Sequence, residues 1–190
     1  MPTNPVTNKA ERIRDLQDLL KQLPDTYFPI TSTYNAINEY DFRQLPAELR
    51  EPTKQNVKIL NLGMMIVYLF ALFESYLQWD EWKGLDDPKE EVYKEAYAEI
   101  FPIIDRLKAY RHIRHSFAHN PNGEKARQQA TEFDLLMAND KPLKGVRVND
   151  GNRIEPSFSS IEELIYCMRT VAALAHSYVM FPADHPSRAQ

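Results

Sequence analysis

The chain has 190 residues, which is enough for one domain with a substantial core and few for two. Its composition, 43% hydrophobic and 26% charged with five glycines, is that of a soluble globular protein without low-complexity segments. The formal net charge of −4 argues against a protein that coats nucleic acid through bulk charge, although it is compatible with a local basic site.

The cysteine content and the N-terminus bear on location. Cys167 is the only cysteine, so an internal disulfide is excluded and a reducing compartment is indicated. Residues 1–9 are polar and contain no signal-peptide core. We therefore expect a cytoplasmic protein.

Residues 8–50 are predicted to form N-terminal helices that precede the main core. An amphipathic pattern begins near residue 8, and Pro24 is expected to end this first helix. Because Pro29 also disfavours helix, residues 25–30 are predicted to be a connector. A second helix is expected over residues 34–49, interrupted at Pro46.

The most apolar part of the chain follows. A long helix is predicted over residues 53–83, ended by Gly84. Within it, Glu74 is the only charged residue between positions 59 and 79. That length matches a bilayer crossing, but polar residues interrupt the run and a central carboxylate is costly in lipid. We expect a helix buried among its neighbours, and no membrane partner.

The next segments are also predicted to be helical. Residues 89–100 carry a helical pattern, and Pro102 is expected to kink it or to start the helix that continues to His119. Residues 120–123, Asn-Pro-Asn-Gly, are a strong stop signal. Residues 124–137 are moderately helical in pattern.

One β-hairpin is predicted near the C-terminal third. Alternating residues flank the Asp150-Gly151 turn, and they place a hairpin around residues 145–155. A final apolar helix is expected from residue 159 or 160 to about residue 179, followed by a mobile tail over residues 182–190. The sequence thus predicts an all-α helical bundle with a small inserted β-hairpin.

The domain organisation that follows is simple. We expect one helical domain over residues 1–190, with a core at about residues 54–180.

One side chain conflicts with this pattern and marks the candidate site. Arg114 falls on the apolar face of its helix, one turn beyond Tyr110 and two turns beyond Leu107. A guanidinium cannot lose its proton. Its burial therefore costs on the order of several kcal/mol, the penalty for one buried ion, unless a partner compensates. Sequences tolerate such conflicts mainly at functional sites.

Glu74 is the expected partner of Arg114. It is the sole charge in the most buried helix, and the desolvation cost of both groups falls if they meet. The alternative is that Glu74 faces a water-filled groove. Residues 106–127 also carry six basic residues against one acid, which suits an anionic ligand, although a solvated basic face is the other explanation.

Two segments of this chain together resemble the HEPN superfamily. They are Phe70-Ala71-Leu72-Phe73-Glu74-Ser75-Tyr76-Leu77 and Arg114-His115-Ser116-Phe117-Ala118-His119-Asn120. HEPN members are helical bundles with an R-x4-6-H motif, usually with a polar residue directly after the Arg. They commonly carry an acidic or polar residue on the preceding long helix. The resemblance covers about residues 54–119, and the final helix more loosely.

The resemblance implies a metal-independent endoribonuclease of toxin–antitoxin or phage-defence systems. Carried over by residue, it implies Arg114 and His119 as the catalytic pair and Glu74 as the orienting acid, and His115 is the polar residue after the Arg. Apart from the resemblance, Asn120 is placed either to contact phosphate in support of the pair or to cap the helix. It also implies a homodimer that shares one cleft, RNA as substrate, an antitoxin or regulatory protein as partner, and no cofactor. One departure is Pro121, where toxins controlled by a nucleotidyltransferase antitoxin carry a modified Tyr.

These side chains suit RNA cleavage through the 2′-hydroxyl. RNA supplies its own nucleophile, so imidazoles can move the protons and a guanidinium can neutralise the charge on the phosphorane. An acid and a base are both needed. The second imidazole would come from His119 of another copy or from His115 of the same chain.

Two other interpretations stay open. His112, His115 and His119 share a helical face and could hold a metal, although ligands at these spacings rarely converge from a straight helix. A non-catalytic HEPN-like module that dimerises or binds a nucleotide or RNA is the other possibility. In that case Asn120 is simply the helix C-cap.

Overall fold

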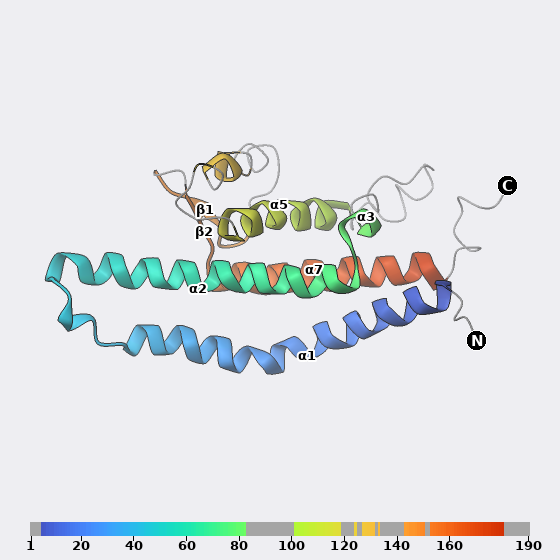
Figure 1. Ribbon diagram of the computed structural model, residues 1–190, viewed down its shortest axis with the longest axis horizontal. Coiled ribbons are helices and arrows are strands. Elements are labelled where there is room, and N and C mark those ends of the chain that lie inside the picture. The colour runs from blue at the N-terminus through green and yellow to red at the C-terminus, as the bar shows by residue number, and fades with distance from the viewer. Residues whose placement is uncertain are drawn as a thin grey trace.

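The computed structural model describes residues 5–82, 101–118, 124, 127–131, 133, 143–150 and 153–180. The described elements are α1 (Pro5–Glu39), η1 (Phe42–Gln44), α2 (Ala47–Tyr76), α3 (Trp79–Trp82), α5 (Phe101–Ala118), β1 (Arg147–Val148), β2 (Ile154–Glu155) and α7 (Phe158–Met180). The long helices α1, α2 and α7 run along the length of the molecule, and α5 lies on the opposite side of α2 and α7 from α1 (Figure 1). The prediction of an all-α bundle with a small hairpin is confirmed.

Helix α1 passes through both Pro24 and Pro29. The prediction that Pro24 ends the first helix was therefore wrong, and so was the prediction of a connector over residues 25–30. Pro24 has no N–H and leaves the carbonyl of Leu20 without its helical donor. Arg169 of α7 donates to that carbonyl oxygen from Nε at 2.9 Å and from Nη2 at 2.6 Å. The helix therefore continues past the proline, with a bend visible part-way along its length (Figure 1).

The turn between α1 and α2 also differs from expectation. The helix predicted over residues 34–49 is divided between the end of α1 and the start of α2, and η1 lies in between. Asp41 caps η1 by accepting a hydrogen bond from the Arg43 N–H at 2.9 Å. Helix α2 begins at Ala47, six residues before the expected start at residue 53, and it includes Pro52.

Helix α2 ends earlier than predicted, at Tyr76, because Leu77 adopts an extended conformation. The short helix α3 starts again after this break. Its Glu81 side chain accepts a hydrogen bond from the Gln78 N–H at 2.8 Å, as in a capping box. Burial alone would raise the pKa of Glu81, but this bond and the cations of Arg12 and Lys9 hold it below its ordinary value.

Helix α2 packs on three other helices and keeps part of its apolar surface exposed. By length and composition it is the one described helix that could cross a membrane, and 39% of its most apolar window is buried. Core helices of soluble proteins can be equally long and apolar. Helix α2 contacts α1, α5 and α7, and its buried side chains are Ile59, Leu62, Met65, Ile66, Leu69, Phe70 and Phe73.

The hairpin forms where the sequence predicts it. Strands β1 and β2 are antiparallel, with Arg147 opposite Glu155 and Val148 opposite Ile154. Arg153 donates to the Asn56 side chain at 3.1 Å and so ties the hairpin to α2.

Some predicted segments cannot be compared with the structure. Residues 89–100 and the tail at 182–190 lie outside the described residues. Within the predicted helix at 124–137, the described residues 124, 127–131 and 133 are helical.

The final helix, α7, begins one residue before the expected range. Its buried residue Glu163 joins α7 to α5 and to the segment before the hairpin. Glu163 accepts hydrogen bonds from Arg106 at 2.5 Å, from the Tyr110 hydroxyl at 2.9 Å and from the Lys144 N–H at 2.6 Å. Burial, followed by the charge of Glu163, raises the pKa of Tyr110 well above its ordinary value. This network fixes the middle of α5 against α7.

The Phe117 ring of α5 packs directly against the backbone of α2 at Gly63. An added Cβ at this position would overlap the ring of Phe117. Gly63 is buried within α2, where any larger residue would push the end of α5 away. The glycine therefore sets the distance between the two helices next to the candidate site.

We predict that Gly63→Ala lowers the free energy of unfolding by about 1–2 kcal/mol. Overpacking of about 1–3 kcal/mol outweighs the roughly 1 kcal/mol that Ala gains in helix propensity. Urea denaturation measures the change. In a Phe117→Ala background, which removes the ring atoms that the new Cβ would meet, the same substitution should be neutral or stabilising. An equal loss in both backgrounds would contradict the close approach.

We predict that Cys167 resists thiol reagents while the protein is folded. Its side chain is buried, and burial together with the charge of Glu163 raises the pKa of the thiol to about 12. The pKa of this thiol is higher in the folded protein than in the unfolded chain. As the pH rises past the unfolded pKa, only the unfolded chain ionises, and the thiol then lowers the stability of the fold. Labelling with a thiol reagent at pH 8 should therefore follow global unfolding, and rapid labelling of the native protein would show that Cys167 is accessible.

Candidate functional site

The site is built on one end of α5, where its apolar face meets α2 and α7. The side chains of that face are fully or almost fully buried, and they are Ile104, Leu107, Tyr110, Ile113 and Phe117. Arg114 lies among them with 24% of its side chain exposed. The conflict seen in the sequence is thus present in the structure, because most of the surface of this charged side chain is buried.

Glu74 of α2 pairs with Arg114 of α5, as predicted. A carboxylate oxygen of Glu74, Oε2, accepts a hydrogen bond from Arg114 Nη1. Glu74 is 18% exposed, so both charges lie in a partly desolvated position where pairing is worth more than at the surface. The guanidinium of Arg114 also lies 5.9 Å from the centre of the Phe70 ring.

Arg111 is a third member of this group, and the sequence did not single it out. Its Nε lies 3.6 Å from Oε1 of Glu74, an ion pair longer than a hydrogen bond. Its guanidinium stacks over the Trp79 ring at 4.2 Å from the centre. The signal that could have found it is its spacing, since Arg111 and Arg114 are three residues apart and share a helix face.

The charges of this group do not balance. Glu74 supplies one negative charge, and within the described part of the chain both Arg111 and Arg114 pair with it. By contrast, the neighbouring Arg106 is paired with Glu163 and Lys108 with Asp105. The local basic excess in the sequence is therefore concentrated, among these α5 residues, at Arg111 and Arg114.

The histidines of the motif are placed only in part. His112 and His115 are half-buried on α5, and His112 Nδ1 lies 3.0 Å from the Gln129 side-chain oxygen. His119 and Asn120 lie outside the described residues, directly after the last described residue of α5. The predicted meeting of Arg114 with His119 therefore stays a prediction.

The metal hypothesis depends on the same unplaced histidine. Among the residues that the structure describes, no three His, Cys, Asp or Glu side chains are grouped to hold a metal ion. Since His119 is not among them, the combination of His112, His115 and His119 is neither supported nor excluded.

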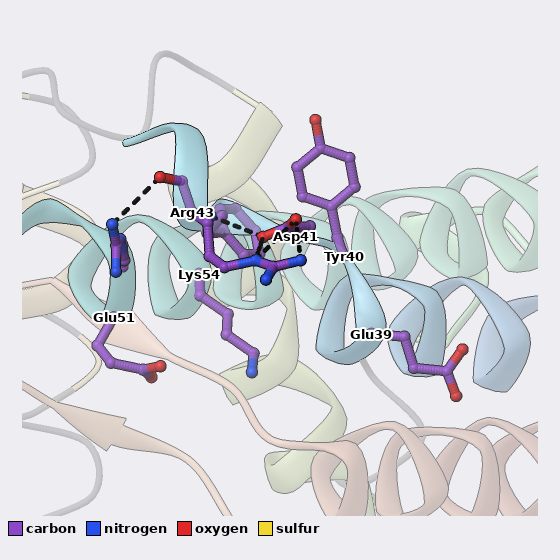
Figure 2. A pocket seen from close by; sticks show the side chains of 8 residues that line it. Glu39, Tyr40, Asp41, Arg43, Glu51 and Lys54 are labelled. Atoms are coloured by element: carbon purple, nitrogen blue, oxygen red, sulfur yellow. Dashed lines mark hydrogen bonds and ion pairs between the residues drawn. The ribbon is translucent and has the colours of Figure 1, made fainter. Parts of the chain in front are cut away.

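A surface cavity lies elsewhere, at the junction of α1 and α2 (Figure 2). Its volume is about 370 Å³, and Arg43 in it pairs with Asp41 at 2.9 Å. Lys54, on its wall, is 20 residues before Glu74 on α2, which is roughly 30 Å of helical rise. This cavity is separate from the Glu74 group.

The comparisons with known proteins add no relative. No family model matches the chain, and neither a curated protein nor a solved structure matches it.

We predict that Glu74→Gln destabilises the fold by about 2–4 kcal/mol, because it leaves two partly buried guanidiniums without their shared counter-charge. Chemical denaturation measures the loss. The matched control, Asp41→Asn, breaks an exposed pair with Arg43 and should leave the midpoint unchanged. Equal effects of the two substitutions would contradict the importance of the Glu74 group.

Proposed function

We propose that this protein is a metal-independent endoribonuclease that uses Arg114 and His119 at a site shared between two copies. The observation that carries this proposal is the pairing of Glu74 with Arg114 across α2 and α5. It fixes a cation in a desolvated position five residues before His119. The resemblance to the HEPN superfamily supports the same residues.

The chemistry asks little beyond these side chains. The 2′-hydroxyl of RNA attacks the adjacent phosphorus, and the bond from phosphorus to the 5′-oxygen breaks. An imidazole, with an ordinary pKa of about 6.5, can accept the hydroxyl proton or protonate the leaving oxygen. Arg114 would neutralise charge on the non-bridging oxygens. The products would be a 2′,3′-cyclic phosphate and a 5′-hydroxyl.

The second copy is supported by an apolar stripe on α2 that the described structure leaves exposed. It consists of Val57, Leu60, Met64 and Tyr68, at spacings of three and four residues. Met64 is 56% and Tyr68 is 62% exposed, which is unusual for side chains of this size. The stripe continues through the exposed Ala71 to within one turn of Glu74. A two-fold pairing that sets the two stripes parallel to each other would bring two Arg114 sites together.

A non-catalytic module is the second candidate. The positive excess of Arg111 and Arg114 over Glu74 would suit the binding of an anion without any cleavage. In either case we propose a cytoplasmic protein of a toxin–antitoxin or phage-defence system, regulated by a protein partner.

We predict that the purified protein cleaves a mixture of single-stranded RNAs in the presence of EDTA. His119→Ala should reduce the rate by about 10²-fold or more, the usual contribution of a general acid or base. Arg114→Lys should also lose activity, because an ammonium cannot reproduce the fork of the guanidinium. Gel analysis and end-group mapping would follow the products.

The control for these variants is His176→Gln on α7, outside the proposed site, which should cleave like the unmodified protein. Circular dichroism and light scattering would verify the fold and oligomeric state of each variant. Intact RNA with a folded unmodified protein would contradict the ribonuclease and favour the binding module. Activity that EDTA abolishes would favour the metal hypothesis.

A further inference from the structure

We infer, on the basis of the ribonuclease function proposed above, that Arg111 is a second cation of this site and that it binds the RNA phosphodiester backbone beside Arg114, positioned by Trp79. The motif that led to Arg114 and His119 assigns no role to Arg111 or Trp79. Three features of the structure support the inference: the fixed orientation of the guanidinium, the charge of the group and the spacing on α5.

The orientation of Arg111 is fixed from two sides. The Trp79 ring covers one face of the guanidinium at 4.2 Å, and Glu74 lies 3.6 Å from its Nε. Arg111 Nε and Glu74 Oε1 are both buried and make no hydrogen bond within the described structure. A cation held in this way loses little conformational entropy when it binds a ligand.

Trp79 is itself anchored to the core. Its ring packs edge-on against Trp82 at 4.6 Å, and Trp82 is fully buried against Phe73 at 6.0 Å. The break at Leu77 turns the chain so that α3 presents Trp79 to α5. The early end of α2 thus has a consequence for the site, because it places an aromatic platform under Arg111.

The net charge of Glu74, Arg111 and Arg114 favours an anion that carries one negative charge. Arg111 and Arg114 carry two positive charges against the single charge of Glu74. Their side chains are 30% and 24% exposed, so each keeps some surface that a ligand can reach while most of it is buried. Each phosphodiester of RNA carries one negative charge, which would balance the group.

The spacing of Arg111 and Arg114 on α5 would let both cations contact one segment of the RNA backbone. Residues three apart on a helix have Cβ atoms about 5–6 Å apart on the same face. A phosphate bound at Arg114 for cleavage would therefore lie within reach of Arg111, or would present its neighbour to it. The simpler alternative is that Arg111 only ties α5 to α2 and α3.

Salt dependence separates these two roles. Fluorescence anisotropy would measure binding of a labelled single-stranded RNA with 2′-O-methyl groups, which cannot be cleaved, between about 50 and 200 mM salt. We predict that Arg111→Gln weakens binding several-fold and reduces the slope of log K against log salt by about 0.7, the value for one phosphate contact on a single strand. A purely structural residue would not change this slope.

Four further variants sharpen the result. Arg43→Gln removes the same charge from η1, which precedes the far end of α2, and should leave the slope unchanged. Arg111→Lys keeps the charge and should keep the slope while weakening affinity, and it remains informative if Arg111→Gln does not fold. Trp79→Leu should weaken binding without a change in slope, and Trp79→Phe should restore it in part.

The outcomes distinguish this inference from the ribonuclease itself. An unchanged slope and affinity for Arg111→Gln would overturn the role of Arg111, whether or not the unmodified protein cleaves RNA. Loss of about 0.7 in slope supports that role even if cleavable RNA stays intact, a result that would contradict only the ribonuclease. An unmodified protein that binds no RNA at low salt would overturn both.

Discussion

The structure depends on one carboxylate that two guanidiniums share. Glu74 is the only charge in the most apolar part of the chain, and it meets Arg114 and Arg111 where α5 crosses the end of α2. None of these charges could be removed from water alone without a cost of several kcal/mol, on the scale of a buried unpaired ion. Together they hold α5 at a fixed position and, among the residues that the structure describes, leave one positive charge in excess. The same interaction therefore stabilises the fold and defines the site.

Other irregular features of the chain are resolved in the same way, by a partner far away in sequence. The carbonyl that Pro24 leaves without a donor is satisfied by Arg169, and the buried Glu163 collects hydrogen bonds from α5 and from the segment before the hairpin. Glu81 caps α3 and at the same time pairs with Arg12 of α1. Each of these polar groups joins helices whose apolar faces alone would allow some sliding.

The sequence predicted the all-α fold, the hairpin and the pairing of Glu74 with Arg114, because each had a local signal. The two charges stood out against apolar faces, and their mutual compensation follows from desolvation. The sequence-based prediction failed at Pro24, because Arg169, which donates to the carbonyl of Leu20 in place of the missing N–H, is 149 residues from Leu20 in the chain. It also missed the end of α2 and the role of Arg111. The apolar pattern continues through Leu77, and Arg111 becomes distinct only when that break brings Trp79 beneath it.

The central claim is that the two guanidiniums around Glu74 bind a phosphodiester backbone. Side-chain Nε–Hε correlations in ¹⁵N NMR test it directly, with an uncleavable RNA titrated into the labelled protein and each signal assigned by substitution. We predict that the signals of Arg111 and Arg114 shift together and saturate at one RNA concentration, while that of Arg43 does not move. Saturable shifts confined to arginines away from Glu74, with Arg111 and Arg114 unaffected, would contradict the claim.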